Sequence, residues 1–145
     1  MIRDLVSCGV DLADPQAFMR GIRATSGRMV GASFSPREVA EAQNEADGLT
    51  VRWAVKEAVA KALGTGLLSG VGLRDIEVVE SGVPGIEVRL RGEAERVANE
   101  LGIKGWHVVV GRVNGLILAV VVTAGRSEVA FTKEEVRNAI PSSSR

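Results

Sequence analysis

A helix-like segment near the middle of the chain places a carboxylate and an amine on the same side as a tryptophan. In RWAVKEAVAKALGTG, residues 52 to 66, Trp53, Glu57 and Lys61 follow one another at intervals of four. At 3.6 residues per turn, these three positions lie on one stripe of a helix. Glutamate four residues before lysine is also the favoured helical ion pair, which contributes only about 0.2–0.5 kcal/mol. The stripe is therefore compatible with a surface ion pair and with a catalytic face.

A second carboxylate, Asp11, stands at the end of the first expected strand. Mg²⁺ is typically held by one or two carboxylates together with phosphate oxygens of a substrate. Asp11 and Glu57 could supply that pair, although an aspartate after a strand often only caps the next helix. Lys61 could reach a phosphate oxygen, and Arg52 and Lys56 lie on nearby parts of the same helix. These residue types together predict an anion site with an associated cation.

The single histidine and the single cysteine give little indication of a catalytic or metal site. His107 is the only histidine and begins an apolar strand, which is typical of a partly buried imidazole. Cys8 is expected to be a small core residue, because no neighbour in the sequence would activate a thiolate. One histidine and one cysteine cannot form a zinc cluster. A serine-hydrolase elbow is also absent from the sequence.

The composition favours one soluble cytoplasmic domain. With 145 residues, 46% hydrophobic, the chain has the size and core of a single domain. Eighteen basic residues balance eighteen acidic ones and aromatic residues make up 3%, which argues against a nucleic-acid surface. The single cysteine and the lack of a signal-like N-terminus favour the cytoplasm. The longest apolar strand candidate, LILAVVVTA, is much shorter than the roughly 20 residues of a membrane helix, so no membrane role is expected.

The first half of the chain is expected to position the two carboxylates on a strand and a helix. Residues 6–12 read as a strand, and Asp14 caps a helix that begins at Pro15. Ser35 and Glu38 form a capping box that opens a second, short helix. The helix with the charged stripe then covers residues 49–63 and stops at Gly64.

The second half is expected to form hairpins. Strands at 75–80 and 86–92 flank SGVPG, a helix covers 93–101, and strands at 106–113 and 116–122 are joined by Asn114-Gly115. A further capping box at 132–135 opens a short helix. The glycine-rich stretch 64–72 follows a helix instead of preceding one, so it favours a flexible connection over a nucleotide loop. Hairpins joined by helices predict an α+β domain with an antiparallel sheet and not a Rossmann fold.

Several segments, taken in order, resemble a known family. They are GVDL at 9–12, RWAVKEAVAKALGTGL at 52–67, DIEV at 75–78, the proline-bearing hairpin, GEAERVANELGI and WHVVV at 106–110. In this order they resemble holo-acyl-carrier-protein synthase, the small bacterial class of 4′-phosphopantetheinyl transferases, from about residue 6 to residue 123. That family transfers phosphopantetheine from coenzyme A to a carrier-protein serine and releases adenosine 3′,5′-bisphosphate.

The resemblance implies a role for each site residue. Asp11 and Glu57 would hold Mg²⁺ on the coenzyme A pyrophosphate. Lys61 would neutralise the phosphates and assist the leaving group, and His107 would position a phosphate or a catalytic water. Both would also contact coenzyme A. The remainder of the coenzyme A site would be lined by Arg52, Gly64, Thr65, Gly66 and Pro84.

The resemblance also implies partners and boundaries. Small members of the family are homotrimers with active sites between subunits. The region of Arg20, Arg23 and Arg28 would grip an acidic acyl carrier protein, or a carrier domain of a larger synthase, in fatty acid biosynthesis. Residues 1–124 would form the transferase domain. Residues 125–145 would be an extension with a short helix and a mobile end, suited to trimer packing or to contact with a larger synthase.

Two alternatives are compatible with the same residues. The chain has HVVVGRVNG where many members of the family have HVSLSH, so it lacks their second histidine. A non-catalytic module that binds coenzyme A or a carrier, and a structural subunit with a chance charge stripe, are the competing interpretations. A decayed site would be expected to lose one of Asp11, Glu57, Lys61 and His107, so their joint presence favours an enzyme.

Overall fold

The computed structural model describes residues 5–43, 45, 47–66, 70–81 and 85–125. Within these ranges the chain forms helices, a short 3-10 helix and strands in a mixed order. The elements are β1 (Leu5–Ala13), α1 (Pro15–Ala24), α2 (Arg28–Ser33), α3 (Pro36–Ala42), α4 (Gly48–Ala62), η1 (Leu73–Asp75), β2 (Ile76–Glu80), β3 (Ile86–Leu90), α5 (Gly92–Glu100), β4 (Gly105–Val113) and β5 (Leu116–Ala124).

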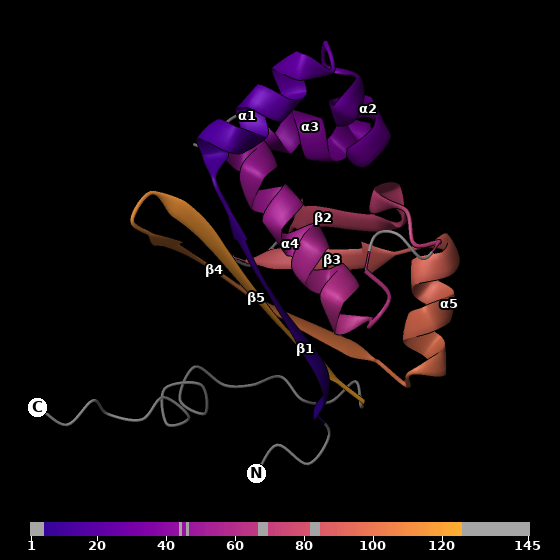
Figure 1. Cartoon of the computed structure of the whole chain (residues 1–145). Coiled ribbons are helices and arrows are strands. Elements are labelled where there is room, and N and C mark those ends of the chain that lie inside the picture. Colours follow the sequence, from indigo (N-terminus) through magenta and orange to yellow (C-terminus); the bar gives the residue numbers. More distant parts are fainter. Residues whose placement is uncertain (1–4, 44, 46, 67–69, 82–84, 126–145) are drawn as a thin grey trace, which may run out of the picture.

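Helix α4 is the central element of the fold (Figure 1). It lies against the antiparallel sheet of order β1-β5-β4 and also packs on the separate hairpin β2-β3. Helices α1 to α3 gather around its first half as a cap (Figure 1). Helix α5 packs beside η1. The α+β class is confirmed, with the strands divided between two sheets instead of one.

Within the described residues the expected elements are found with small shifts at their ends, and two further elements, α2 and the short η1, were not expected. The side chain of Asp14 caps α1, and the Ser35–Glu38 capping box opens α3. Helix α2 has no sequence signal, because its N-cap is Gly27 with φ 78° and no capping side chain. The predicted helix at 132–135, most of the extension 125–145 and Pro84 lie outside the described residues.

The Asn114-Gly115 turn sets the register of the β1-β5-β4 sheet. Both residues have positive φ, 50° and 78°, as a two-residue type I′ hairpin requires, and Val113 pairs with Leu116. One face of the sheet then packs on α4, because alternate residues of a strand point to opposite faces. On β5 these core residues are Ile117, Ala119, Val121 and Thr123, each fully buried.

The opposite face of this sheet is apolar as well, and we call it the outer face. Antiparallel sheets usually present polar residues on the side away from the core. Here Val109 is 61% exposed and Val10 is 49% exposed. Cys8 also lies on this face and is exposed, so its expected core position is wrong. By register the outer face consists of Cys8, Val10, Leu12, His107, Val109, Gly111, Val113, Leu116, Leu118, Val120 and Val122.

Strand β1 crosses α4 with no side chain between the two backbones. A Cβ added at Gly9 would lie 1.9 Å from the Ala58 carbonyl oxygen and 2.8 Å from the Ala62 nitrogen. Only glycine fits at this crossing. The crossing brings the end of β1, with Asp11, beside the middle of α4.

We expect Gly9→Ala to destabilise the protein strongly. The added methyl group meets backbone atoms, so strand and helix must separate, at a cost of about 3 kcal/mol. Urea unfolding monitored by circular dichroism measures this loss. Gly31→Ala is the matched control, because a Cβ at this helical glycine meets nothing within 4 Å. A Gly9→Ala protein as stable as wild type would show that the crossing is not tight.

Candidate active site

The central helix and the first strand together present the predicted carboxylates and lysine. Trp53 and Glu57 on α4 are half-buried, and Lys61, one turn further along, is exposed. The Lys61 ammonium donates to Asp11 Oδ1 at 2.9 Å and to the Val10 carbonyl oxygen at 3.0 Å. Among the described residues Lys61 therefore pairs with Asp11 and not with Glu57, so the helical ion pair, one of the two interpretations of the stripe, is not formed.

Glu57 is held in an unfavourable environment for a carboxylate. Burial raises the pKa of its carboxyl group above the ordinary value, and the charge of Asp11 raises it further. Lys61 offsets this only in part. Two carboxylates thus share one neighbouring ammonium, an arrangement that a divalent cation would relieve.

The two carboxylates suit magnesium better than a metal with an all-protein site. No group of three Asp, Glu, His or Cys side chains in the described part of the chain could hold a metal ion. Mg²⁺ keeps water and phosphate ligands and needs only one or two carboxylates from the protein. Asp11 and Glu57 fit this requirement.

A pocket of about 500 Å³ opens beside these carboxylates. Asp11 and Glu57 contribute to its lining, and Trp53 forms part of its wall. The rest of the lining comes from the end of β1 and from α1 and α2. The site is therefore a concave surface with charge on one part and apolar side chains on the rest.

His107 lies away from this pocket within one copy of the chain. It pairs with Val122 across β4 and β5, whereas Asp11 pairs with Ala119, three residues along β5. Three residues of strand span about 10 Å, and odd separations place side chains on opposite faces. His107 is thus on the outer face, while Asp11 is on the face toward α4.

The segment after α4 continues from Lys61. Gly64 and Gly66 have φ of 74° and 59°, and neither would place a Cβ within 4 Å of another atom. Thr65 between them is half-buried. Both glycine positions are therefore sterically open, and a ligand can approach the backbone closely in this segment, which follows Lys61 in the chain.

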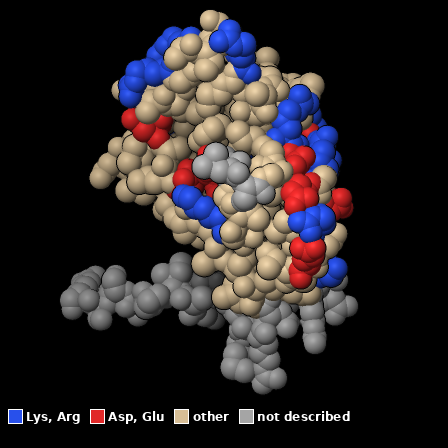
Figure 2. All heavy atoms as spheres, turned by 45° about the vertical axis from the view of Figure 1, so that its right-hand side comes forward, with Lys and Arg blue, Asp and Glu red and all other residues tan. Residues whose placement is uncertain are grey.

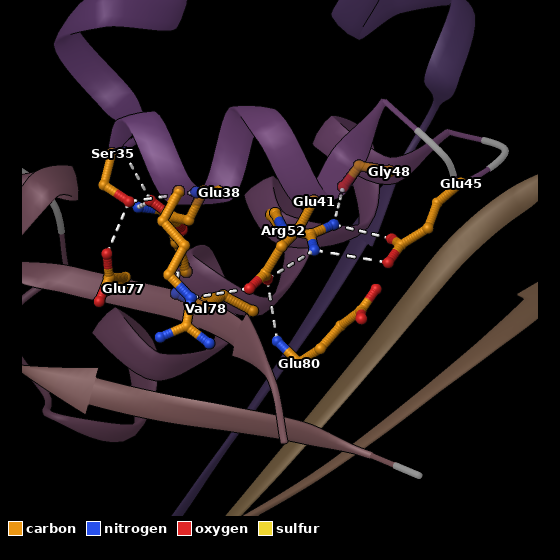
Figure 3. A network of polar contacts seen from close by, with 11 residues as sticks. Ser35, Glu38, Glu41, Glu45, Gly48, Arg52, Glu77, Val78 and Glu80 are labelled. Carbon is orange, nitrogen blue, oxygen red and sulfur yellow. Dashed lines mark hydrogen bonds and ion pairs between the residues drawn. The ribbon is translucent and has the colours of Figure 1, made fainter. Parts of the chain in front are cut away.

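Arg52, predicted to line the coenzyme A site, has a different arrangement. Its side chain is 4% exposed, and Nη1 donates to Glu45 at 2.7 Å and to the Gly48 carbonyl oxygen at 3.1 Å (Figure 3). Nη2 donates to Glu41, which also accepts from the Glu80 amide (Figure 3). Arg52 does not contribute to the pocket and instead fastens α4 to α3 and β2, so the geometry within one chain does not support its predicted role.

Lys56, predicted to contribute to an anion site, is completely buried, so that interpretation is wrong. Its ammonium donates to Glu38 at 3.0 Å and to three backbone carbonyl oxygens. Glu38 in turn accepts from the amides of Ser35 and Val78 (Figure 3). Burial lowers the pKa of Lys56, and the charge of Glu38 opposes that shift. The carbonyl acceptors belong to Ser33, Leu73 and Ile76.

We expect Lys56→Met to destabilise the protein by about 3–5 kcal/mol. The change removes one partner of a buried ion pair and leaves Glu38 charged without compensation. Thermal and urea unfolding measure the effect. Arg89→Met is the control, because the exposed Arg89 pairs with Glu87 alone within the described ranges, and it should leave the unfolding midpoint near wild type. Equal midpoints for the two variants would contradict a supporting role for Lys56.

Comparison with known proteins gives one consistent result. Residues 7–121 match the model of the 4′-phosphopantetheinyl transferase superfamily. A holo-[acyl-carrier-protein] synthase of Herpetosiphon aurantiacus is 35% identical over 124 residues, covering 81% of this chain and 97% of that protein.

Solved structures agree in fold. The holo-[acyl-carrier-protein] synthase of Neisseria meningitidis is similar with a TM-score of 0.72 and 26% identity, covering 82% of this chain and 98% of that chain. The Helicobacter pylori enzyme, solved in complex with coenzyme A, has a TM-score of 0.71 and 20% identity, covering 81% and 99%. At that identity the second likeness shows the fold alone.

Proposed function

This chain belongs to the 4′-phosphopantetheinyl transferase superfamily and is a transferase of the holo-acyl-carrier-protein synthase type, and we propose how its residues carry out the reaction. The 4′-phosphopantetheine group passes from coenzyme A to a serine of an apo acyl carrier protein. The serine hydroxyl gives up its proton to solvent as its oxygen forms a bond to the β-phosphorus, the bond from that phosphorus to the bridging oxygen breaks, and adenosine 3′,5′-bisphosphate leaves with that oxygen.

The pairing of Asp11 with Lys61 beside Glu57 carries this proposal. Asp11 and Glu57 would hold one magnesium ion, which supplies positive charge to the pyrophosphate. Once Asp11 binds a cation, the Lys61 ammonium can donate to a phosphate oxygen instead. Its charge then stabilises the negative charge that develops on the leaving phosphate, which is the main requirement of phosphoryl transfer.

The outer face supports assembly with further copies of the chain, and we propose a homotrimer. Monomeric proteins rarely expose a continuous apolar patch larger than a few hundred Å². Here the outer face is apolar across β1, β5 and β4, and strand β5 is apolar on both faces, as expected for a strand that is covered on both sides. His107 lies on this face, so it can join Asp11 and Glu57 only from a neighbouring copy.

Three exposed arginines on the cap support the proposal that the carrier docks there. Arg20 and Arg23 on α1 and Arg28 on α2 are exposed, and basic side chains gather at the end of the molecule formed by the cap (Figure 2). None of them forms an ion pair within the part of the chain that the structure describes. An acidic carrier docked there would lie beside the pocket.

Arg23→Glu should raise the KM for the carrier about tenfold and leave the KM for coenzyme A unchanged. Charge reversal at a docking surface mainly slows encounter with an oppositely charged partner, and the defect should shrink at high salt. Steady-state kinetics with each substrate varied in turn measures both constants. Arg89→Glu, on β3 away from the cap, is the control. A coenzyme A defect in Arg23→Glu would refute the assignment.

The decisive test of the function is transfer itself. The protein is incubated with coenzyme A, magnesium and candidate apo-carriers, and the carrier is followed by intact mass. Gain of one phosphopantetheine group that stops on magnesium chelation supports the proposal. Binding of coenzyme A or carrier without any mass change would favour the alternative, a non-catalytic binding module.

We place this reaction in the cytoplasm and in fatty acid biosynthesis, where carriers with a modified serine hold the growing chain. The resemblance and the lone exposed Cys8 support this placement. No helix in the described part of the chain is long and apolar enough to cross a membrane.

A further inference from the structure

The pocket beside the carboxylates has two chemically different parts. One part is formed by Asp11, Asp14 and Glu57. The other is apolar and comes from the first two helices and from α4, with Ala17, Phe18, Met29 and Trp53 among its residues. Lys61 and the segment that follows it do not line the pocket. A ligand that extends from Lys61 into the pocket would therefore pass the carboxylates first and then meet the apolar wall.

The aromatic side chains of the apolar wall pack against further buried side chains. Phe18 is 8% exposed and lies against Trp53 with ring centroids 5.4 Å apart. Phe34 meets Phe18 edge to face at 6.2 Å, and the buried Lys56 ammonium lies 5.1 Å from the Phe34 ring. Rings fixed in this way lose little freedom when a ligand packs against them, which favours binding.

The chemistry of coenzyme A indicates which half enters this pocket. The adenosine bisphosphate half is strongly anionic, and the three carboxylates of the pocket would repel it. The phosphopantetheine arm is uncharged beyond its phosphate, and its second carbon carries two methyl groups. That dimethyl carbon is joined through one methylene to the phosphate oxygen, so a phosphate held near Asp11, Glu57 and Lys61 places it at the mouth of the pocket.

We propose that this pocket binds the pantoyl part of the phosphopantetheine arm, with Ala17, Phe18, Met29 and Trp53 as its apolar contacts. The inference rests on the proposed function. It orients coenzyme A with its nucleotide toward Lys61 and Gly64 and its arm toward Trp53. It also lets the protein distinguish coenzyme A from the product adenosine 3′,5′-bisphosphate, which has no arm.

Filling the pocket tests this directly. Ala17→Leu adds bulk at an exposed helical position, so the fold should tolerate it. We expect the Kd of coenzyme A and of free 4′-phosphopantetheine, measured by calorimetry with magnesium, to rise about tenfold. The Kd of adenosine 3′,5′-bisphosphate should stay within about twofold. Ala24→Leu, at the end of the same helix and outside the pocket, is the matched control.

Each other outcome overturns the proposal in its own way. A raised KM for the carrier with unchanged coenzyme A binding would assign the pocket to the carrier. Equal weakening of coenzyme A and adenosine 3′,5′-bisphosphate would mean that the change disturbs the charged part of the site. No change in any constant would mean that no ligand enters. Because these constants come from binding, they remain informative even if the wild-type protein transfers nothing, which would instead refute the proposed function.

Discussion

Glu57→Gln should lower phosphopantetheine transfer by about a thousandfold or more and leave the protein folded. As a magnesium ligand, Glu57 contributes several kcal/mol of transition-state stabilisation, and each 1.36 kcal/mol corresponds to about a factor of ten in rate. A surface ion-pair partner would contribute less than about 0.5 kcal/mol. Turnover measured against magnesium concentration separates the two roles, because only the loss of a ligand raises the magnesium requirement.

The stability of the same variant is a second, independent readout. The folded protein raises the pKa of Glu57, so it binds a proton that the unfolded chain has already released. Stability therefore falls as pH rises through the interval between the unfolded and the folded pKa. At neutral pH glutamine avoids this cost, so Glu57→Gln should melt at or slightly above the wild-type temperature without metal.

Glu93→Gln on α5 is the control for both measurements, because its half-buried carboxylate lies outside the pocket and pairs with Arg96 alone among the residues that the structure describes. It should keep full activity. A well-folded Glu57→Gln with wild-type turnover would remove Glu57 from the metal site and leave the stripe on α4 as a surface feature.

Two inactive variants should restore activity when they are mixed. His107→Ala alone should lose about a hundredfold or more, because it removes a group that positions phosphate. If the site combines Glu57 of one copy with His107 of the next, mixed trimers of Glu57→Gln and His107→Ala contain intact sites. Random exchange leaves about a quarter of the interfaces intact, so about a quarter of the wild-type rate should return.

The readout is activity after the two proteins are co-refolded or co-expressed. If both groups came from one chain, no mixture would contain an intact site, and activity would stay at the level of the single variants. Val109→Glu supplies the complementary control. A charge at this exposed position costs the single chain little but should prevent assembly, so light scattering should show a monomer without transfer activity.

Local sequence rules predicted the elements that hold the site. The Asp14 cap, the Ser35 capping box and the Asn114-Gly115 turn each depend on near neighbours in the chain, and the structure confirms all three. Asp11 and Glu57 were paired from their chemistry and from the family resemblance. The structure brings both to one pocket, because Gly9 lets strand and helix meet.

The residues whose positions differ from the sequence-based expectation are placed by contacts with distant parts of the chain. A lysine in an apolar helix has no local mark that separates the buried Lys56 from the exposed Lys61. Lys56 is buried because four other segments of the chain contribute hydrogen-bond acceptors for its ammonium group. The arrangement of Arg52 was not foreseen for the same reason, since its partners Glu41 and Glu45 lie before α4. Helix α2 was missed because it has neither a capping side chain nor an apolar period.

The contact at Gly9 also has a kinetic meaning. With no side chain between β1 and α4, the separation of Asp11 and Glu57 is set by contact of hard backbone atoms rather than by rotamers that can change. Strand and helix then move as one rigid body, and the two carboxylates keep their spacing when the ion leaves. Magnesium exchange should accordingly proceed without a slow conformational phase, at a rate limited by the release of water from the ion.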